Sequence, residues 1–173
     1  KLNLFDCDRK ALESYFADIG EKSFRAHQLL KWIYQHGVIN IESMSNLSND
    51  LRAYLKENTS VKLPEIITEK KSKDGTKKWL IKVDEKNSIE TVFIPENDRG
   101  TLCISTQVGC ALDCKFCSTA QQGFSRNLTT SEIIGQVWVA NKILGHFENG
   151  NRMITNIVFM GMGEPLLNYD NVL

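Results

Sequence analysis

Apolar side chains in the first sixty residues recur at helical spacing. Three or four positions separate them between Asp8, a candidate helix cap, and Gly20, a candidate stop. The same spacing returns between Ser23, a second candidate cap, and Gly37, and again over residues 47–55. The pattern predicts three short helices over residues 1–60, enough for a small helical accessory domain. Such a domain either serves packing alone or binds a partner, and an RNA partner is our expectation.

Residues 61–100 change to a pattern typical of strands. Lys77–Val83 and Ile89–Ile94 are expected strands, the residues 84–88 between them are an expected turn, and Asp74-Gly75 is a tighter turn signal upstream. We expect a β-hairpin connector. Five lysines gather around the upstream turn: Lys70, Lys71, Lys73, Lys77 and Lys78. They form either a solvated hairpin tip or a contact for RNA phosphates.

The pattern of residues 101–173 predicts a strand, a helix and a second strand. The segment 101–106 is an expected strand, and Thr129 and Glu132 have the spacing of a helix capping box. The helix behind them has an apolar stripe made of Ile133, Ile134, Val137, Ala140 and Leu144. The apolar segment 153–160 is expected to be a parallel strand covered on both faces. The fold class is therefore α+β leading into α/β, with one βαβ unit at the end.

Composition narrows the classes of function. Hydrophobic residues make up 42% of the 173 residues and charged residues 24%, as in an average globular protein. Lys plus Arg and Asp plus Glu each number 21, so a uniformly basic nucleic-acid coat is excluded while a local basic patch is not. The sequence has no run of 18 apolar residues and no signal-peptide core, which favours a cytoplasmic protein with no membrane segment.

Four of the five cysteines lie within residues 103–117, and only Cys7 stands apart. Clustered cysteines in a chain without a secretory signal favour metal or redox chemistry over a disulfide framework. Cys110, Cys114 and Cys117 have the spacing C-x3-C-x2-C, which suits three thiolate ligands of an iron–sulfur cluster with one iron left open. The alternative is a four-cysteine zinc site that includes Cys103, although zinc ligands usually come as two separated pairs.

The cysteine segment resembles a known family. CISTQVGCALDCKFCST at 103–119, QGFSRNL at 122–128, GMGEPLLN at 161–168 and IETVFIP at 89–95 are similar to the bacterial radical S-adenosylmethionine (SAM) RNA methyltransferases that modify carbon 2 of adenine. The resemblance implies that residues 101–173 begin a (β/α) radical-SAM barrel, of which this chain has only part. It also implies RNA substrates, namely 23S rRNA and tRNA, an electron donor such as flavodoxin, and a monomeric full-length enzyme.

The resemblance assigns cofactor roles to individual residues. Cys110, Cys114 and Cys117 would hold a 4Fe–4S cluster whose open iron binds SAM. Phe116 would lie near the adenine of SAM, and Gly163 and Glu164 would approach its methionyl part. One-electron cleavage of SAM then supplies a radical.

The same resemblance implies two catalytic residues, Glu90 and Cys103. A methylated cysteine becomes attached to carbon 2 of adenine, Glu90 removes the carbon-2 proton, and Cys103 resolves the adduct by forming a disulfide. Glu90 shares a strand face with Val92 and Ile94, so we expect partly buried, apolar surroundings that would raise the pKa of its carboxyl. The alternative is that this face is solvated and that Glu90 only aids solubility.

The cysteine that carries the methyl group in this family has no counterpart in the sequence, because Cys7 has no matching motif. We therefore expect the chain to be the N-terminal portion of the enzyme and to be inactive alone. Two alternatives remain open. One is the related methyltransferase that modifies carbon 8 of adenine, and the other is a zinc-containing RNA-binding module.

Overall fold

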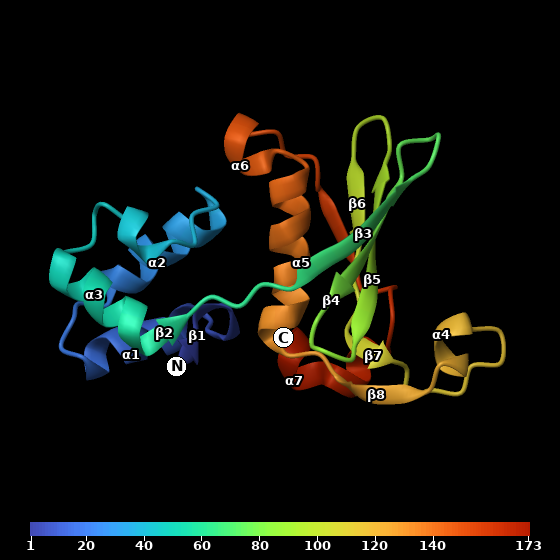
Figure 1. Ribbon diagram of the computed structural model, residues 1–173, viewed down its shortest axis with the longest axis horizontal. Coiled ribbons are helices and arrows are strands. Elements are labelled where there is room, and N and C mark those ends of the chain that lie inside the picture. The colour runs from blue at the N-terminus through green and yellow to red at the C-terminus, as the bar shows by residue number, and fades with distance from the viewer. The chain divides into compact units, whose positions relative to one another are not determined.

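A computed structural model describes all residues from 1 to 173 (Figure 1). The chain divides into two compact units, residues 1–62 and residues 63–173. None of its helices has the length and apolar character needed to cross a membrane.

The first unit is helical. It contains α1 (Arg9–Asp18), α2 (Phe24–Tyr34) and α3 (Asn49–Asn58), two short 3-10 helices, η1 (Leu4–Asp6) and η2 (Ile41–Ser43), and a parallel pair made of β1 (Leu2–Asn3) and β2 (Thr59–Ser60). The three predicted helices are thus confirmed. Their buried faces meet in a core that includes Leu12, Phe16, Leu29, Ile33, Leu51 and Leu55.

Two of the helix starts are fixed by side-chain caps. The carboxylate of Asp8 accepts a hydrogen bond from the backbone N–H of Ala11 at 2.7 Å, as predicted. The hydroxyl of Ser48 caps α3 in the same way, by accepting from the N–H of Leu51. The predicted cap at Ser23 is wrong in detail, because this residue already has helical backbone angles and its side chain makes no capping hydrogen bond.

A five-stranded sheet organises the second unit. In spatial order its strands are β3 (Glu65–Lys71), β4 (Lys77–Lys82), β5 (Ser88–Pro95), β6 (Gly100–Cys103) and β9 (Asn156–Val158). The first four are antiparallel neighbours, whereas β9 runs parallel to β6. Strands from both sides of residue 100 therefore share one sheet.

The helix α5 (Thr130–Ile143) lies along one face of this sheet (Figure 1). Its capping box forms as predicted, with Thr129 and Glu132 exchanging side-chain to backbone hydrogen bonds. Ile133 and Ala140 belong to the same buried cluster as Trp79, Phe93 and Leu102 of the sheet. The connection from β6 through α5 to the parallel strand β9 confirms the βαβ unit. Only one face of the sheet is covered by this helix.

Smaller elements surround the end of the sheet. They are the hairpin of β7 (Gln107–Gly109) and β8 (Phe124–Asn127), α4 (Ser118–Gln121), α6 (His146–Asn149), η3 (Pro165–Asn168) and α7 (Tyr169–Val172). The cysteine loop connects β7 to α4 and projects past the sheet (Figure 1).

Two strand predictions need correction. The segment 101–106 is a strand only as far as Cys103, after which the chain leaves the sheet to reach β7. Of the segment 153–160 only three residues form β9, and this strand is not covered on both faces, because Asn156 and Ile157 are exposed.

Candidate functional site

The cysteine loop is closed at its base by the β7–β8 hairpin. The N–H of Cys110 donates to the carbonyl of Gly123 at 3.1 Å. Gly109, with a φ of 76°, makes this approach possible, because a Cβ at that position would lie 1.7 Å from the same carbonyl oxygen. The loop between these residues carries all three predicted cluster ligands.

All five cysteines are free thiols. Cys117 sits at the start of α4, where the N–H groups of Ala120 and Thr119 hydrogen-bond to its sulfur and lower the pKa of its thiol. The N–H of Leu112 points at the sulfur of Cys110 at 3.5 Å. The backbone donors at Cys117 stabilise the thiolate, the form that binds iron.

The donor set therefore fits an iron–sulfur cluster chemically, as three soft ligands on one loop. The structure does not gather them, however, since no group of three or more Cys, His, Asp or Glu side chains is close enough to hold a metal ion. Cys103 lies apart on β6, and so the four-cysteine zinc arrangement is not assembled either. Phe116 is 94% exposed on the same loop.

The segment Gly161–Glu164 runs against residues 104–107, between the end of β6 and the start of β7. The N–H of Gly161 donates to the carbonyl of Ile104 at 3.1 Å, and the carbonyl of Met162 accepts from Thr106 at 2.8 Å. Glu164 then caps η3 by accepting from the N–H of Leu166. These contacts fix the two residues predicted to approach SAM, Gly163 and Glu164, beside the start of β7.

Gln107 joins this segment to the cysteine loop. Its side-chain Oε1 accepts from the N–H of Glu164 at 3.0 Å and from the N–H of Ala111 at 3.3 Å. Its Nε2 donates to Oδ1 of Asn127 on β8 at 2.9 Å. Because the residue is only 1% exposed, one buried amide connects three segments that carry the candidate site. Sequence reasoning missed this residue.

A second buried amide, that of Gln136 on α5, ties the helix to the sheet. Its Oε1 accepts from the Ser105 N–H and the Thr91 hydroxyl, both at 2.8 Å, and its Nε2 donates to the Ser105 carbonyl at 2.9 Å. The Ser105 hydroxyl donates to the Glu90 carbonyl at 2.6 Å and accepts from the N–H of Met162 at 2.9 Å. This network aligns the strand that carries Glu90 with the segment that carries Glu164.

The two predicted catalytic residues share the sheet face opposite α5. Cys103 on β6 pairs directly with Val92 on β5, so these two side chains project from the same face. Glu90 lies two residues along β5 and therefore on that face as well. The structure thus brings Glu90 and Cys103 onto adjacent strands and one open face.

The surroundings predicted for Glu90 are wrong. Its side chain is 48% exposed, and its carboxylate forms an ion pair with Nζ of Lys78 on β4 at 2.9 Å. Ile94 on the same face is also exposed. Alternation identified the face correctly, but this face is open to solvent rather than apolar and covered.

Cys103 is half-buried, and burial raises the pKa of its thiol, against a smaller lowering by a hydrogen bond from the Met160 backbone. It is therefore mainly a neutral thiol near pH 7.

Arg126, within the segment 122–128, anchors β8. Its guanidinium donates to both carboxylate oxygens of Glu132 at 2.8 Å and to Oδ2 of Asp84 at 2.6 and 3.0 Å. Hydrogen bonds from the Asn87 side chain and then from Arg126 hold the pKa of the Asp84 carboxyl well below its usual range. The turn before β5, the strand after the cysteine loop and the start of α5 are thereby held together.

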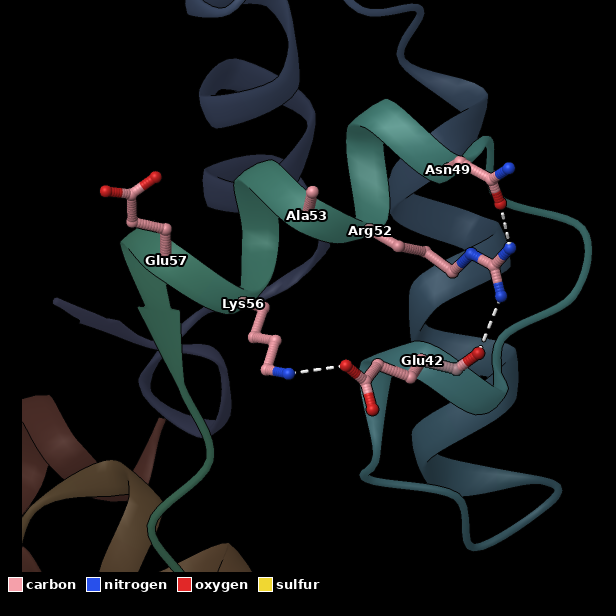
Figure 2. A pocket seen from close by; sticks show the side chains of 6 residues that line it. All are labelled: Glu42, Asn49, Arg52, Ala53, Lys56 and Glu57. Atoms are coloured by element: carbon pink, nitrogen blue, oxygen red, sulfur yellow. Dashed lines mark hydrogen bonds and ion pairs between the residues drawn. The ribbon is translucent and has the colours of Figure 1, made fainter.

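The helical unit carries a separate hollow of about 540 Å³, lined by Glu42, Asn49, Arg52, Ala53, Lys56 and Glu57. Figure 2 shows that its two cations are already paired: Arg52 donates to the carbonyl of Glu42 and to the side chain of Asn49, and Lys56 forms an ion pair with the Glu42 carboxylate. Its polar groups largely satisfy one another.

Each of the two units matches a known protein family. Residues 2–61 match the family described as the ribosomal RNA large subunit methyltransferase N-terminal domain, and residues 104–173 match the radical SAM superfamily. Two curated relatives are named dual-specificity RNA methyltransferase RlmN. The chain is 53% identical over 172 residues to the one from Marinobacter nauticus and 58% identical over 173 residues to the one from Alkalilimnicola ehrlichii. Over almost its whole length the chain is therefore similar to dual-specificity RNA methyltransferases.

Each match to a relative in this family covers 99% of the chain but only 47% of the relative. The chain thus spans about half the length of the curated relatives it matches. A crystal structure of a radical SAM methyltransferase from Sphaerobacter thermophilus superimposes with a TM-score of 0.86 at 37% identity, over 99% of this chain and 50% of that one. The mixed α/β fold is therefore similar to half of that radical SAM methyltransferase.

Proposed function

We propose that the full-length protein methylates carbon 2 of an adenine in 23S rRNA and in tRNA. One observation carries the proposal: Glu90 and Cys103 lie on adjacent strands and on one open sheet face, in a chain similar to dual-specificity RNA methyltransferases. The cysteine loop and the segment Gly161–Glu164 join this sheet through buried hydrogen bonds. A proton acceptor, a thiol and a cofactor loop are the groups that this reaction requires.

Cys110, Cys114 and Cys117 would hold a 4Fe–4S cluster, with Phe116, Gly163 and Glu164 binding SAM. The chemistry that such a cluster supplies when bound is one-electron cleavage of SAM. The backbone hydrogen bonds that lower the pKa of the Cys117 thiol favour the thiolate form of this ligand. Gln107 keeps the loop and the Glu164 backbone in register around the bound group.

Glu90 acts as the base. Its carboxylate forms an ion pair with Lys78 and is the group that would accept the carbon-2 proton. Its half-exposed position on the open face leaves it accessible to a nucleotide.

Cys103 resolves the covalent protein–RNA adduct. Its thiolate attacks the sulfur of the methyl-carrying cysteine, so that an S–S bond forms and the S–C bond breaks. The electron pair passes to the carbon, which takes up a proton and becomes the methyl group. The burial that raises the pKa of the thiol keeps Cys103 protonated until that step.

The remaining assignments belong to the same proposal. The first unit acts as an RNA-binding accessory domain, residues 101–173 begin the (β/α) barrel, and the full-length enzyme works as a cytoplasmic monomer with an electron donor such as flavodoxin. The family match over residues 2–61 supports the first of these.

The test uses the full-length protein with its cluster reconstituted, SAM carrying a labelled methyl group, a reductant, and unmodified 23S rRNA or tRNA transcripts. Digestion to nucleosides and mass spectrometry should find the label in 2-methyladenosine. Label at carbon 8 would favour the related carbon-8 enzyme instead, and unlabelled RNA in all reactions would overturn the proposal. The 173 residues alone should transfer no label.

A further inference from the structure

We propose that Lys70 and Lys78 form a binding site for RNA phosphates on the open sheet face, next to the position of the target adenine. This inference rests on the proposed function, because it names the part of the chain that holds the RNA backbone while Glu90 and Cys103 act on the base. The ligand class is an RNA phosphodiester, and the partner is the substrate strand itself.

The register of the β3–β4 hairpin places lysines directly opposite one another. Lys70 pairs with Lys78, and Lys71 pairs with Lys77. Like charges in opposing cross-strand positions repel and destabilise a sheet, typically by a few tenths of a kcal/mol to about 1 kcal/mol. Two such lysine pairs in succession would not stabilise the hairpin. They are better explained as a site where a bound anion neutralises the repulsion.

One of the two pairs faces the candidate site. Lys78 pairs with Val92 on β5, and Val92 pairs with Cys103 on β6, so all three side chains project from the same face. Lys70 extends the same row by one strand. With neighbouring strands about 4.8 Å apart, Lys78 lies roughly 10 Å and Lys70 roughly 14 Å from Cys103 along the sheet. A strand of RNA that places its adenine over Cys103 would therefore carry its backbone across these lysines.

The charges around the row leave Lys70 available. Lys70 is exposed and forms no ion pair, whereas Lys78 is already paired with Glu90 at the edge of the site and would have to share its charge with a phosphate. The cations of the helical unit at Arg52 and Lys56 are in contrast bound to Glu42 (Figure 2). Because the chain has no net charge, RNA contacts must come from local sites of this kind.

The hairpin itself provides a matched control. Lys71 and Lys77 lie on the same two strands and form the same kind of cross-strand pair, but they project from the opposite face, the one on which α5 packs. Replacing either pair with glutamine removes the same charge from the same hairpin. Only the pair on the open face should affect RNA held over Cys103.

The experiment measures binding of a fluorescently labelled, unmodified 23S rRNA transcript to the full-length protein across a series of salt concentrations. Lys70→Gln should weaken binding roughly threefold or more and reduce the slope of log affinity against log salt by about 1. Lys70→Gln combined with Lys78→Gln should weaken it further. The control double variant, Lys71→Gln with Lys77→Gln, should bind as the wild type does.

Thermal unfolding separates this result from a folding defect, because Lys70→Gln removes a repulsion and should leave the Tm unchanged or slightly higher. Equal losses from both lysine pairs, or no loss from Lys70→Gln, would overturn the proposed site. Failure of the wild type to methylate any RNA would instead contradict the proposed function. The two outcomes can be distinguished, because the lysine site is tested by RNA binding and the function by analysis of the methylated product.

Discussion

The backbone N–H of Glu164 and the side-chain oxygen of Gln107 form a hydrogen bond of 3.0 Å that connects the two halves of the candidate cofactor site. The same oxygen accepts from Ala111 in the cysteine loop. One buried acceptor therefore serves two backbone donors that are 53 positions apart in the sequence. The amide of Gln107 is neutral, so it can hold these two segments in position beside an iron–sulfur cluster without adding a charge to the site.

Replacing Gln107 with leucine should loosen the cofactor site. The change removes the acceptor of the N–H groups of Ala111 and Glu164, and the loss of each of these part-buried hydrogen bonds should cost about 1 kcal/mol. In the full-length protein we expect weaker SAM binding by equilibrium dialysis and less iron per chain after reconstitution.

Gln136→Leu is the matched control, since it removes an equally buried amide that has no bond to the cysteine loop and reaches the Glu164 segment only indirectly, through Ser105. It should lower the Tm while retaining iron. Equal loss of iron in both variants would mean that Gln107 has only a general role in stability.

Gly163→Ala should destabilise the segment that carries Glu164. Gly163 has a φ of 93°, and a Cβ there would lie 2.4 Å from Cβ of Gln107. Gly150→Ala isolates the conformational part of the cost, because Gly150 has a φ of 66° but nothing within 4 Å of an added Cβ. We expect Gly150→Ala to cost about 1 kcal/mol and Gly163→Ala clearly more, as measured by chemical unfolding. Similar costs for the two would show that the contact with Gln107 is not tight.

Local signals in the sequence were enough for much of the fold. The helices near Asp8 and Ser48 have amphipathic faces, and the capping box at Thr129 needs only residues three positions apart. The strand Glu65–Lys71 was missed, because charged side chains occupy most of its positions and hide any alternation. Such a strand is stable as the sheet edge, where only one neighbour is needed and charges prevent unwanted pairing.

In the candidate site, too, local features could be predicted from the sequence, whereas features that depend on the fold could not. The cysteine spacing is local and was readable, whereas the role of Gln107 depends on a partner 57 positions away that only the fold brings close. Alternation placed Glu90 on the correct strand face, but it could not show which face α5 would cover. The ion pair with Lys78 likewise depends on the register of two strands.

The reactivity of Cys103 should increase with pH over an unusually high range. Because burial raises the pKa of its thiol, the reactive thiolate forms only above the ordinary value of about 8.5. Alkylation of Cys103 by iodoacetamide in the full-length protein, followed by mass spectrometry at several pH values, should show a midpoint above that value. A midpoint below it would contradict the half-buried position of this thiol.

The contact between Asp84 and Arg126 should make stability sensitive to acid. The folded-state pKa of Asp84 is depressed, so its contribution is fully present above the ordinary value of about 3.9 and is lost as the pH falls toward the folded-state value. Asp84→Asn should therefore lower the Tm near pH 7, and its difference from the wild type should shrink below about pH 4. Arg126→Gln should produce part of the same loss. A difference that stays constant with pH would rule out the ion pair as its cause.

The most direct test of the account compares wild-type and Cys103→Ala full-length proteins in a single turnover with SAM, reductant and labelled RNA. The wild type should release RNA that contains 2-methyladenosine. The variant lacks the thiol that resolves the adduct, so the RNA should remain covalently attached to the protein on a denaturing gel. Release of 2-methyladenosine by the variant at the wild-type rate would contradict the role of Cys103 on the open sheet face.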